Sequence, residues 1–443
     1  MTYPVRVAKN SLALYAPVLM FLSFAYGCRR SDSTTSVDAA AHVHPAGSEA
    51  TTTPNPSGDH ERVLPWIEND WDEAFRLARR DKKKVFVDVW ATWCHTCLSM
   101  KEFVFSDPKI LAARDKVIWL ALDTDRPENE KRIKVLAAPA LPTFYLFDAD
   151  KPDPIRRVVG SMSVEESLAF LGEGTGVPSA YEKVFALHHA KKYAECIEVA
   201  SAATPTSPAD DLNTRALATT CALEQSPRNT KGLHELAAEL SKRVNDLRSN
   251  VIADDRSGAY EVLVEALDAL SKEAPKPNAQ DSKALQEAKK QRDEEARHWV
   301  TFLDLEASAT TSAKARAVFD PHRYLAYSAA GTPEKAIPML LQSAKDFPDD
   351  FNPHARLAKV YLELKQFDRA EESIGIALGK GYGPRKLRLY ATAISIARGQ
   401  KDVAREGVRI REALTFSESF SLSAGYKKLV AEFQARANEL GKK

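Results

Sequence analysis

Two cysteines that closely follow a short apolar stretch constrain this chain more than any other feature. Residues 85–90 form a β-branched and aromatic run typical of a buried strand. Cys94 begins a C-x-x-C motif that ends at Cys97, and residues 98–102 can form a helix. A C-x-x-C between a strand and a helix is typical of a redox dithiol, and the sequence has no second C-x-x-C to complete four zinc ligands. We therefore predict thiol–disulfide chemistry and no metal site.

The predicted position of the dithiol gives its two sulfurs different roles. Cys94 would lie at the helix N-terminus, where free N–H groups and the helix dipole stabilise the nucleophilic thiolate. Cys97, one turn further on, would resolve a mixed disulfide formed at Cys94. His95 either adds a positive charge beside the thiolate, which would make the disulfide more oxidising, or points to solvent with little effect.

Residues 90–97, Trp-Ala-Thr-Trp-Cys-His-Thr-Cys, resemble the signature of the thioredoxin family. Asp88 matches the buried acidic residue of that family, and Leu141-Pro142 matches its cis-proline loop. The resemblance implies that Asp88 accepts and returns a proton for the resolving cysteine, which requires a pKa raised by burial. It also implies that Trp93, Leu141 and Pro142 contact the substrate. A surface carboxylate at position 88 and an ordinary trans proline at position 142 are the alternatives.

A narrower resemblance covers residues 66–172, which are similar to the C-terminal periplasmic domain of the DsbD family of thiol:disulfide interchange proteins. It rests on residues 105–110, 119–123 and 157–160. The sequence shows no counterpart of that family's membrane-embedded electron-transfer helices, so we expect a separate membrane or periplasmic electron donor. The residues between the two cysteines match neither thioredoxins nor strong oxidants. The direction of electron flow therefore stays open, because small changes in potential decide it.

The N-terminus predicts an extracytoplasmic address. Residues 1–28 combine a basic start with an apolar run and end at Ala-Tyr-Gly-Cys, which resembles a bacterial lipoprotein cleavage box. Cys28 would then be the lipidated residue; an uncleaved signal anchor and a buried core segment are the alternatives. Residues 29–61 are rich in Ser, Thr, Ala and Pro and predict a disordered linker. We expect a membrane-anchored protein of the periplasm.

The remaining sequence divides into two folded domains. Residues 62–175 predict an α/β thioredoxin fold, and residues 178–440 predict an all-α, tetratricopeptide-like helical solenoid. A 34-residue period carries the second prediction. It places small residues in one phase and larger apolar residues four positions later: Ala336, Ala370 and Ala404, then Leu340, Ile374 and Val408. Such repeats resemble tetratricopeptide repeats and imply a docking surface for a protein partner, with a passive spacer as the alternative.

Other cysteines and histidines of the helical part carry weaker signals. Cys196 and Cys221 fall on apolar helix faces, where they either pack as small hydrophobes or form a structural disulfide. Six histidines share no ligand spacing and are interpreted as packing or surface residues: His188, His189, His234, His298, His322 and His354.

Composition and motifs together favour one function. A net charge of +1 argues against nucleic acid as a partner. We expect a membrane-tethered thiol–disulfide oxidoreductase, of the protein-disulfide reductase type, that acts on exported proteins with disulfides. Its redox-active disulfide would be its only redox group, with no other cofactor. The alternative is a repeat scaffold or assembly protein whose thioredoxin-like domain is a redox sensor or a relic.

Overall fold

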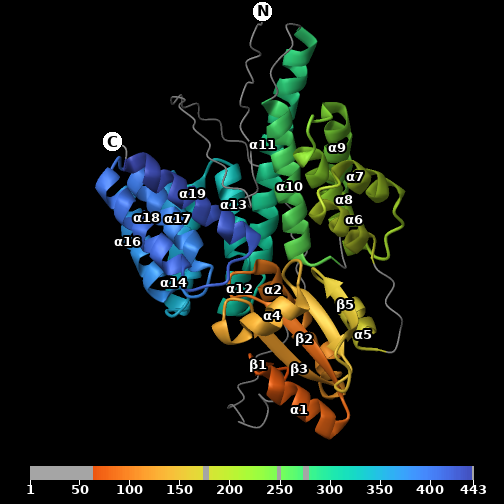
Figure 1. The fold of residues 1–443 in the computed structure, drawn as a ribbon. Helices are drawn as coiled ribbons and strands as arrows, with labels where there is room; N and C mark the ends of the chain where they lie inside the picture. The colour runs from red at the N-terminus through yellow and green to blue at the C-terminus, as the bar shows by residue number, and fades with distance from the viewer. Residues whose placement is uncertain (1–62, 173–178, 247–250, 273–278, 442–443) are drawn as a thin grey trace, which may run out of the picture.

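The computed structural model describes residues 63–172, 179–246, 251–272 and 279–441. They form one domain built on a β-sheet, followed by a long helical region (Figure 1). The predicted export signal, its Cys28 and the predicted linker lie outside the described residues. Within the described ranges, no helix has the length and apolar character needed to cross a bilayer.

A five-stranded mixed sheet with the order β1-β3-β2-β4-β5 is the centre of the first domain. Its central strand β2 runs parallel to β3 and antiparallel to β4, and is almost completely buried. The β-branched and aromatic composition expected of a buried strand explains this position. The strands are β1 (Trp66–Glu68), β2 (Lys84–Trp90), β3 (Val117–Asp123), β4 (Thr143–Phe147) and β5 (Pro154–Val159).

Helices cover both faces of this sheet. One core cluster packs Phe86 against the π-helix η1 and against α5, while the opposite face packs Phe75 of α1 against β2, β3 and β4. The helical elements are α1 (Trp71–Asp81), α2 (His95–Ser99), η1 (Met100–Val104), α3 (Pro108–Leu111), η2 (Arg114–Lys116), η3 (Pro127–Asn129), α4 (Glu130–Leu136) and α5 (Val164–Leu171).

The apolar spacing of residues 66–80 predicts an amphipathic helix that begins at Trp66, but α1 begins only at Trp71, so this interpretation was wrong for residues 66–68. These residues pair with β3 as strand β1. Asn69 adopts a positive φ of 61°, and the side chain of Asp70 accepts the backbone N–H of Glu73 as an N-cap. The cap sets the start of the helix because it satisfies a donor that the first turn leaves free.

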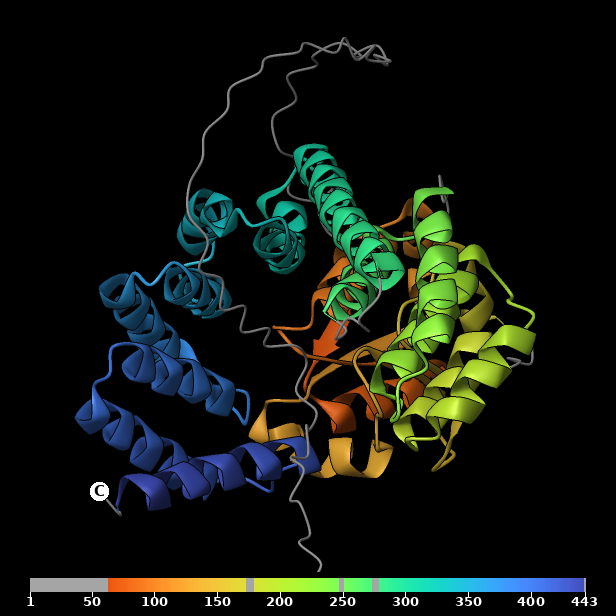
Figure 2. The same ribbon diagram turned by 90° about the horizontal axis from the view of Figure 1, so that it is seen from above.

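The helical region forms an arc around one end of the sheet domain. The arc runs from α6–α9 on one side, through α10 and α11, to α13–α19 on the other side (Figures 1 and 2). Its elements are α6 (Ala180–His189), α7 (Tyr193–Ala202), α8 (Pro208–Glu224), α9 (Thr230–Asp246), α10 (Ala253–Ser271), α11 (Ala279–Ser308), α12 (Ala313–Val318), α13 (Asp320–Ala329), η4 (Pro333–Lys335), α14 (Ala336–Asp346), α15 (Asn352–Glu363), α16 (Phe367–Lys380), α17 (Lys386–Gly399), α18 (Val403–Ser417) and α19 (Ala424–Leu440).

The 34-residue period describes two of its three predicted repeats. The first two small residues and the apolar residues four positions after each are completely buried: Ala336, Ala370, Leu340 and Ile374. In the third repeat the period fails, because Ala404 is exposed and Val408 is 41% exposed. The buried positions of α18 lie two residues further on, at Glu406 and Ile410. Ile410 and Ala413 pack into a hydrophobic cluster, and they follow Ile374 and Ala377 by 36 residues rather than 34. Glu406 forms ion pairs at the same face with Arg398 and Arg436.

A disulfide joins α7 to α8 near the start of the helical region. Cys196 and Cys221 form this bond between two completely buried positions. Of the two possibilities that the sequence left open, packing and pairing, both therefore apply to these cysteines.

Candidate dithiol active site

Cys94 and Cys97 form a disulfide at the point where β2 leads into α2. Cys94 is the N-cap of α2, and its sulfur accepts the backbone N–H of Cys97 at 3.2 Å. Cys94 is 6% exposed, and Cys97 is completely buried. In the reduced protein, the N–H donor and the helix dipole both favour the Cys94 thiolate, as a nucleophilic cysteine requires.

Asp88 lies in the middle of β2 and is only 1% exposed. Neither of its carboxylate oxygens has a hydrogen-bond partner among the described residues. Burial raises the pKa of Asp88 to about 7, although the nearby Lys101 ammonium lowers it in part. A carboxyl group with this pKa can take up and release a proton at neutral pH, which is the property expected of a proton acceptor for a resolving cysteine.

Lys101, on η1, is a site residue that the sequence interpretation missed. Its ammonium lies 3.1 Å from the centroid of the Trp90 ring, and burial lowers its pKa. The helical spacing of four residues from Cys97 to Lys101 could have identified this lysine as a neighbour of the dithiol.

The residues predicted to contact substrate occupy different surroundings. Leu141 packs against Cys94 and Cys97, and the peptide bond between Leu141 and Pro142 is cis. Trp93 packs against the same two cysteines and also against the helical region. Its indole N–H donates to Asp125 at 2.6 Å, and the guanidinium of Arg385 lies 4.2 Å from its ring centroid.

The loop between α16 and α17, together with α15, contacts the residues just before the dithiol. Asn352 donates to the backbone carbonyl of Thr92 at 3.3 Å. The hydroxyl of Tyr382 lies 3.3 Å from that of Thr92 and donates to Asp123 at 2.9 Å. Sequence reasoning did not bring Asn352, Tyr382 or Arg385 to this site, because 250 or more residues separate them from the dithiol.

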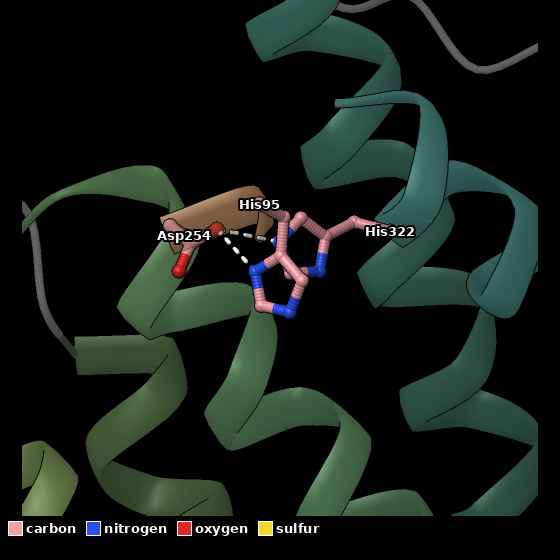
Figure 3. A group of neighbouring side chains, drawn as sticks. All are labelled: His95, Asp254 and His322. Atoms are coloured by element: carbon pink, nitrogen blue, oxygen red, sulfur yellow. Dashed lines mark hydrogen bonds and ion pairs between the residues drawn. The ribbon is translucent and has the colours of Figure 1, made fainter. Parts of the chain in front are cut away.

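The first turn of α10 also contacts the dithiol helix, through Asp254 (Figure 3). Asp254 accepts from Nδ1 of His95 at 2.8 Å, from the Thr96 hydroxyl at 2.6 Å and from Nε2 of His322 at 2.7 Å. Burial opposes protonation of His95, but the Asp254 carboxylate outweighs it and raises the pKa of His95. Burial and the neighbouring His95 lower the pKa of His322. His95 therefore neither points freely to solvent nor acts alone beside the sulfur.

Comparisons with known proteins agree with this architecture. The family profile described as thioredoxin-like matches residues 66–149, and a tetratricopeptide repeat profile matches residues 327–379. The chain thus contains a thioredoxin-like domain followed by a helical region with tetratricopeptide repeats. The predicted fold class and the predicted resemblance are confirmed.

Among individual proteins, the domain is similar to thiol:disulfide interchange protein DsbD from two bacteria. The protein of Ralstonia nicotianae is 32% identical over 111 residues, which are 25% of this chain and 18% of that protein. The protein of Pectobacterium atrosepticum is 32% identical over 95 residues, 21% of this chain and 16% of that protein. The chain therefore spans less than a fifth of the length of these relatives. A thioredoxin from Thermus thermophilus, solved in solution, is 27% identical with a TM-score of 0.23, over 25% of this chain and 85% of that one.

Proposed function

We propose that the protein is a thiol–disulfide oxidoreductase that reduces disulfides in other proteins. The observation that carries this proposal is the Cys94–Cys97 disulfide at the start of α2, with a buried Asp88 of pKa about 7 on the preceding strand. The thioredoxin-like profile and the similarity to DsbD support the reaction class. The dithiol itself would carry the electrons, without an organic cofactor.

The reaction follows from the different surroundings of the two sulfurs. In the reduced protein, the Cys94 thiolate attacks a substrate disulfide, and one substrate sulfur leaves as a thiolate. Cys97 then gives its proton to Asp88 and attacks the Cys94 sulfur, which releases the second substrate thiolate and forms the Cys94–Cys97 disulfide. Two electrons have passed to the substrate, so a separate dithiol donor must reduce the protein again.

Trapping of mixed disulfides tests this mechanism. Cys97→Ala should accumulate a covalent complex with a disulfide-containing protein substrate, because the resolving sulfur is missing, whereas Cys94→Ala should not. Non-reducing electrophoresis gives the result, and Cys196→Ala/Cys221→Ala serves as a control for the structural disulfide. Equal trapping by both single variants would contradict the assigned roles. A reduction potential near about −270 mV would support a reductant, and one near about −120 mV would indicate an oxidant.

We also propose that the protein acts in the periplasm and is anchored to the membrane through a lipidated Cys28. The sequence of residues 1–28 supports this location. Cys28→Ser should release the protein from membranes into the soluble fraction. Persistent membrane association would instead favour an uncleaved signal anchor.

The helical region supports a docking role beside the dithiol. Lys359 lies near three other cationic side chains, Arg356, Arg385 and Arg388. Burial and these arginines lower the pKa of Lys359 to about 8. The carboxylates near this cluster are Asp320 and Asp350, beside Arg356, and Asp125, beside Arg385. Because Arg385 also covers Trp93, an acidic segment of a substrate or partner bound at this cluster would lie next to the dithiol.

One observation favours a second candidate, a redox sensor that signals through the repeats. The helical region contacts Thr92, His95 and Thr96 directly, so a change at the dithiol could alter its packing. Under this alternative, a Cys94→Ala/Cys97→Ala variant should still bind its partner and lose only the response to oxidants. Loss of substrate reduction in the same variant would favour the oxidoreductase.

A further inference from the structure

Three side chains from separate elements converge beside the dithiol. His95 is on α2, Asp254 on α10 and His322 on α13 (Figure 3). Their potential ligand atoms all lie within 4.8 Å of one another, and one oxygen of Asp254 is 2.8 Å from His95 Nδ1 and 2.7 Å from His322 Nε2. Two imidazoles and one carboxylate are a ligand set that first-row transition metals bind in proteins.

The surroundings of the three side chains also fit a cation. Asp254 is 4% exposed and His322 is 1% exposed, and burying a carboxylate is costly unless a positive charge compensates it. The negative charge of Glu261 acts on His95 as well, opposed by the positive charge of Arg356. The second oxygen of Asp254 accepts the Thr96 hydroxyl, the kind of contact that orients a metal-ligating carboxylate.

Without an ion, the same three residues can share protons through hydrogen bonds. Zinc bonds of about 2.0–2.2 Å place neighbouring ligand atoms roughly 3.3 Å apart. Each of the two distances from Asp254 to an imidazole would then lengthen by about half an ångström, and the two imidazole nitrogens, which lie within 4.8 Å of one another, would take up the same separation. The side chain of His95 is 42% exposed and leaves a route for an ion from solvent.

We propose that His95, Asp254 and His322 bind one divalent transition-metal ion of the zinc type, with a remaining coordination position for water. The bound ion would tie the residue that follows Cys94 to two helices of the helical region. This proposal replaces the expectation of no metal site and the interpretation of His322 as a packing or surface residue. It does not depend on the proposed reductase activity, because the ligands include neither cysteine of the dithiol.

Titration of the oxidised full chain with Zn²⁺ tests the proposal. Oxidation keeps Cys94 and Cys97 from binding the ion. A background of Cys28→Ser, His42→Ser, His44→Ser and His60→Ser, without a histidine tag, removes other potential ligands near the N-terminus. Calorimetry should show one Zn²⁺ per chain. Co²⁺ in its place should give visible absorption bands without a thiolate charge-transfer band.

Variants of each ligand give the decisive comparison. His95→Gln, Asp254→Asn and His322→Gln should each weaken Zn²⁺ binding more than 100-fold. Thr96→Val should weaken it roughly 10- to 100-fold, because the Thr96 hydroxyl orients the Asp254 carboxylate without binding the ion itself. His298→Gln is the matched control. His298 also pairs with a carboxylate, that of Glu295, but no second histidine joins them in the described residues, so binding should be unchanged.

Two results would overturn the proposal. One is the absence of Zn²⁺ binding by the oxidised background protein, which would leave a hydrogen-bonded triad only. The other is binding that survives all three ligand variants, which would place the ion elsewhere. If His322→Gln fails to fold, His95→Gln decides the question, because its partly exposed side chain can be replaced with less effect on packing. Either outcome leaves the trapping result at Cys97 unaffected.

Discussion

At the scale of single residues, burial of Asp88 destabilises the folded protein at neutral pH but gives the carboxyl a pKa suited to proton transfer. Its carboxyl is buried without a hydrogen-bond partner among the described residues, and burial raises its pKa to about 7. An acid whose pKa is higher in the folded state binds protons more tightly there. Stability is therefore highest below the unfolded pKa of about 4 and falls as the pH rises to about 7.

Asp88→Asn should consequently stabilise the protein, and the gain should depend on pH. It should be close to zero at pH 4, grow as the pH rises, and level off above pH 7 at no more than about 4 kcal/mol. Chemical unfolding at several pH values measures this difference. A gain independent of pH would mean that the carboxyl does not titrate in this range.

The same substitution should slow resolution of the mixed disulfide. In the wild type, the rate of release from a Cys94-linked substrate should show an inflection near pH 7, where Asp88 changes protonation. Asp88→Asn should remove this inflection while Cys94 still forms the mixed disulfide. Stopped-flow measurement of product thiols follows the step, and an inflection that persists would assign the proton transfer to another group.

At the scale of elements, positions in one phase of the 34-residue period differ in burial. Ile374 is completely buried between α16 and its neighbours, whereas Val408 is exposed on α18. Ile374→Ala should lower the free energy of unfolding by roughly 2–5 kcal/mol, and Val408→Ala by less than about 0.5 kcal/mol. Denaturant titration measures both losses in the free energy of unfolding. Equal losses would mean that Val408 is as buried on α18 as Ile374 is on α16.

The disulfide between α7 and α8 should stabilise the helical region. Cys196 and Cys221 are 25 residues apart, and closing a loop of this size contributes roughly 3 kcal/mol. In a Cys94→Ala/Cys97→Ala background, which removes the other disulfide, Cys196→Ala/Cys221→Ala should lower the melting temperature, and a reductant should then lower it no further. A reductant-induced decrease of equal size in this variant and in the background protein would show that another bond is responsible.

Local sequence signals explain which elements were predictable. Strand β2 and the helix after Cys94 consist of residues that favour strand and helix, respectively. In the matched repeats, Tyr327 and Tyr361 are 34 residues apart and both are buried. The start of α1 was missed because an N-cap, rather than apolar spacing, sets it. The face of α18 was missed because its buried positions follow those of α16 by 36 residues, which puts the 34-residue pattern out of register by two residues.

At the scale of the whole molecule, the dithiol lies between two parts of the helical arc. Asp254 of α10 contacts His95 and Thr96, between the two cysteines. Asn352 and Tyr382, from the other part of the arc, contact Thr92 just before the dithiol. No local signal predicts these contacts, since they depend on how the helices pack against the sheet domain. Residue types such as Asp88 and Pro142 could be predicted from a resemblance; Asp254 and His322 could not.

The cationic cluster provides a test of docking at this scale. Lys359→Ala/Arg388→Ala should raise the KM for an acidic protein substrate several-fold, because opposite charges increase association, and should leave kcat nearly unchanged. The rate with a small disulfide should be unaffected. The matched control is Lys345→Ala, an exposed lysine on α14 outside the cluster. Equal effects of both variants would argue against a docking site there.

Three side chains of the dithiol loop pair with side chains of the helical region: Thr92 with Tyr382, and His95 and Thr96 with Asp254. An exchange at one of these loop positions therefore leaves a polar partner unsatisfied across the interface. We expect positions 92, 95 and 96 to covary with positions 254 and 382 among descendants of this two-part protein. A thioredoxin-like domain transplanted from elsewhere would fit this arc only after matching changes at those five positions.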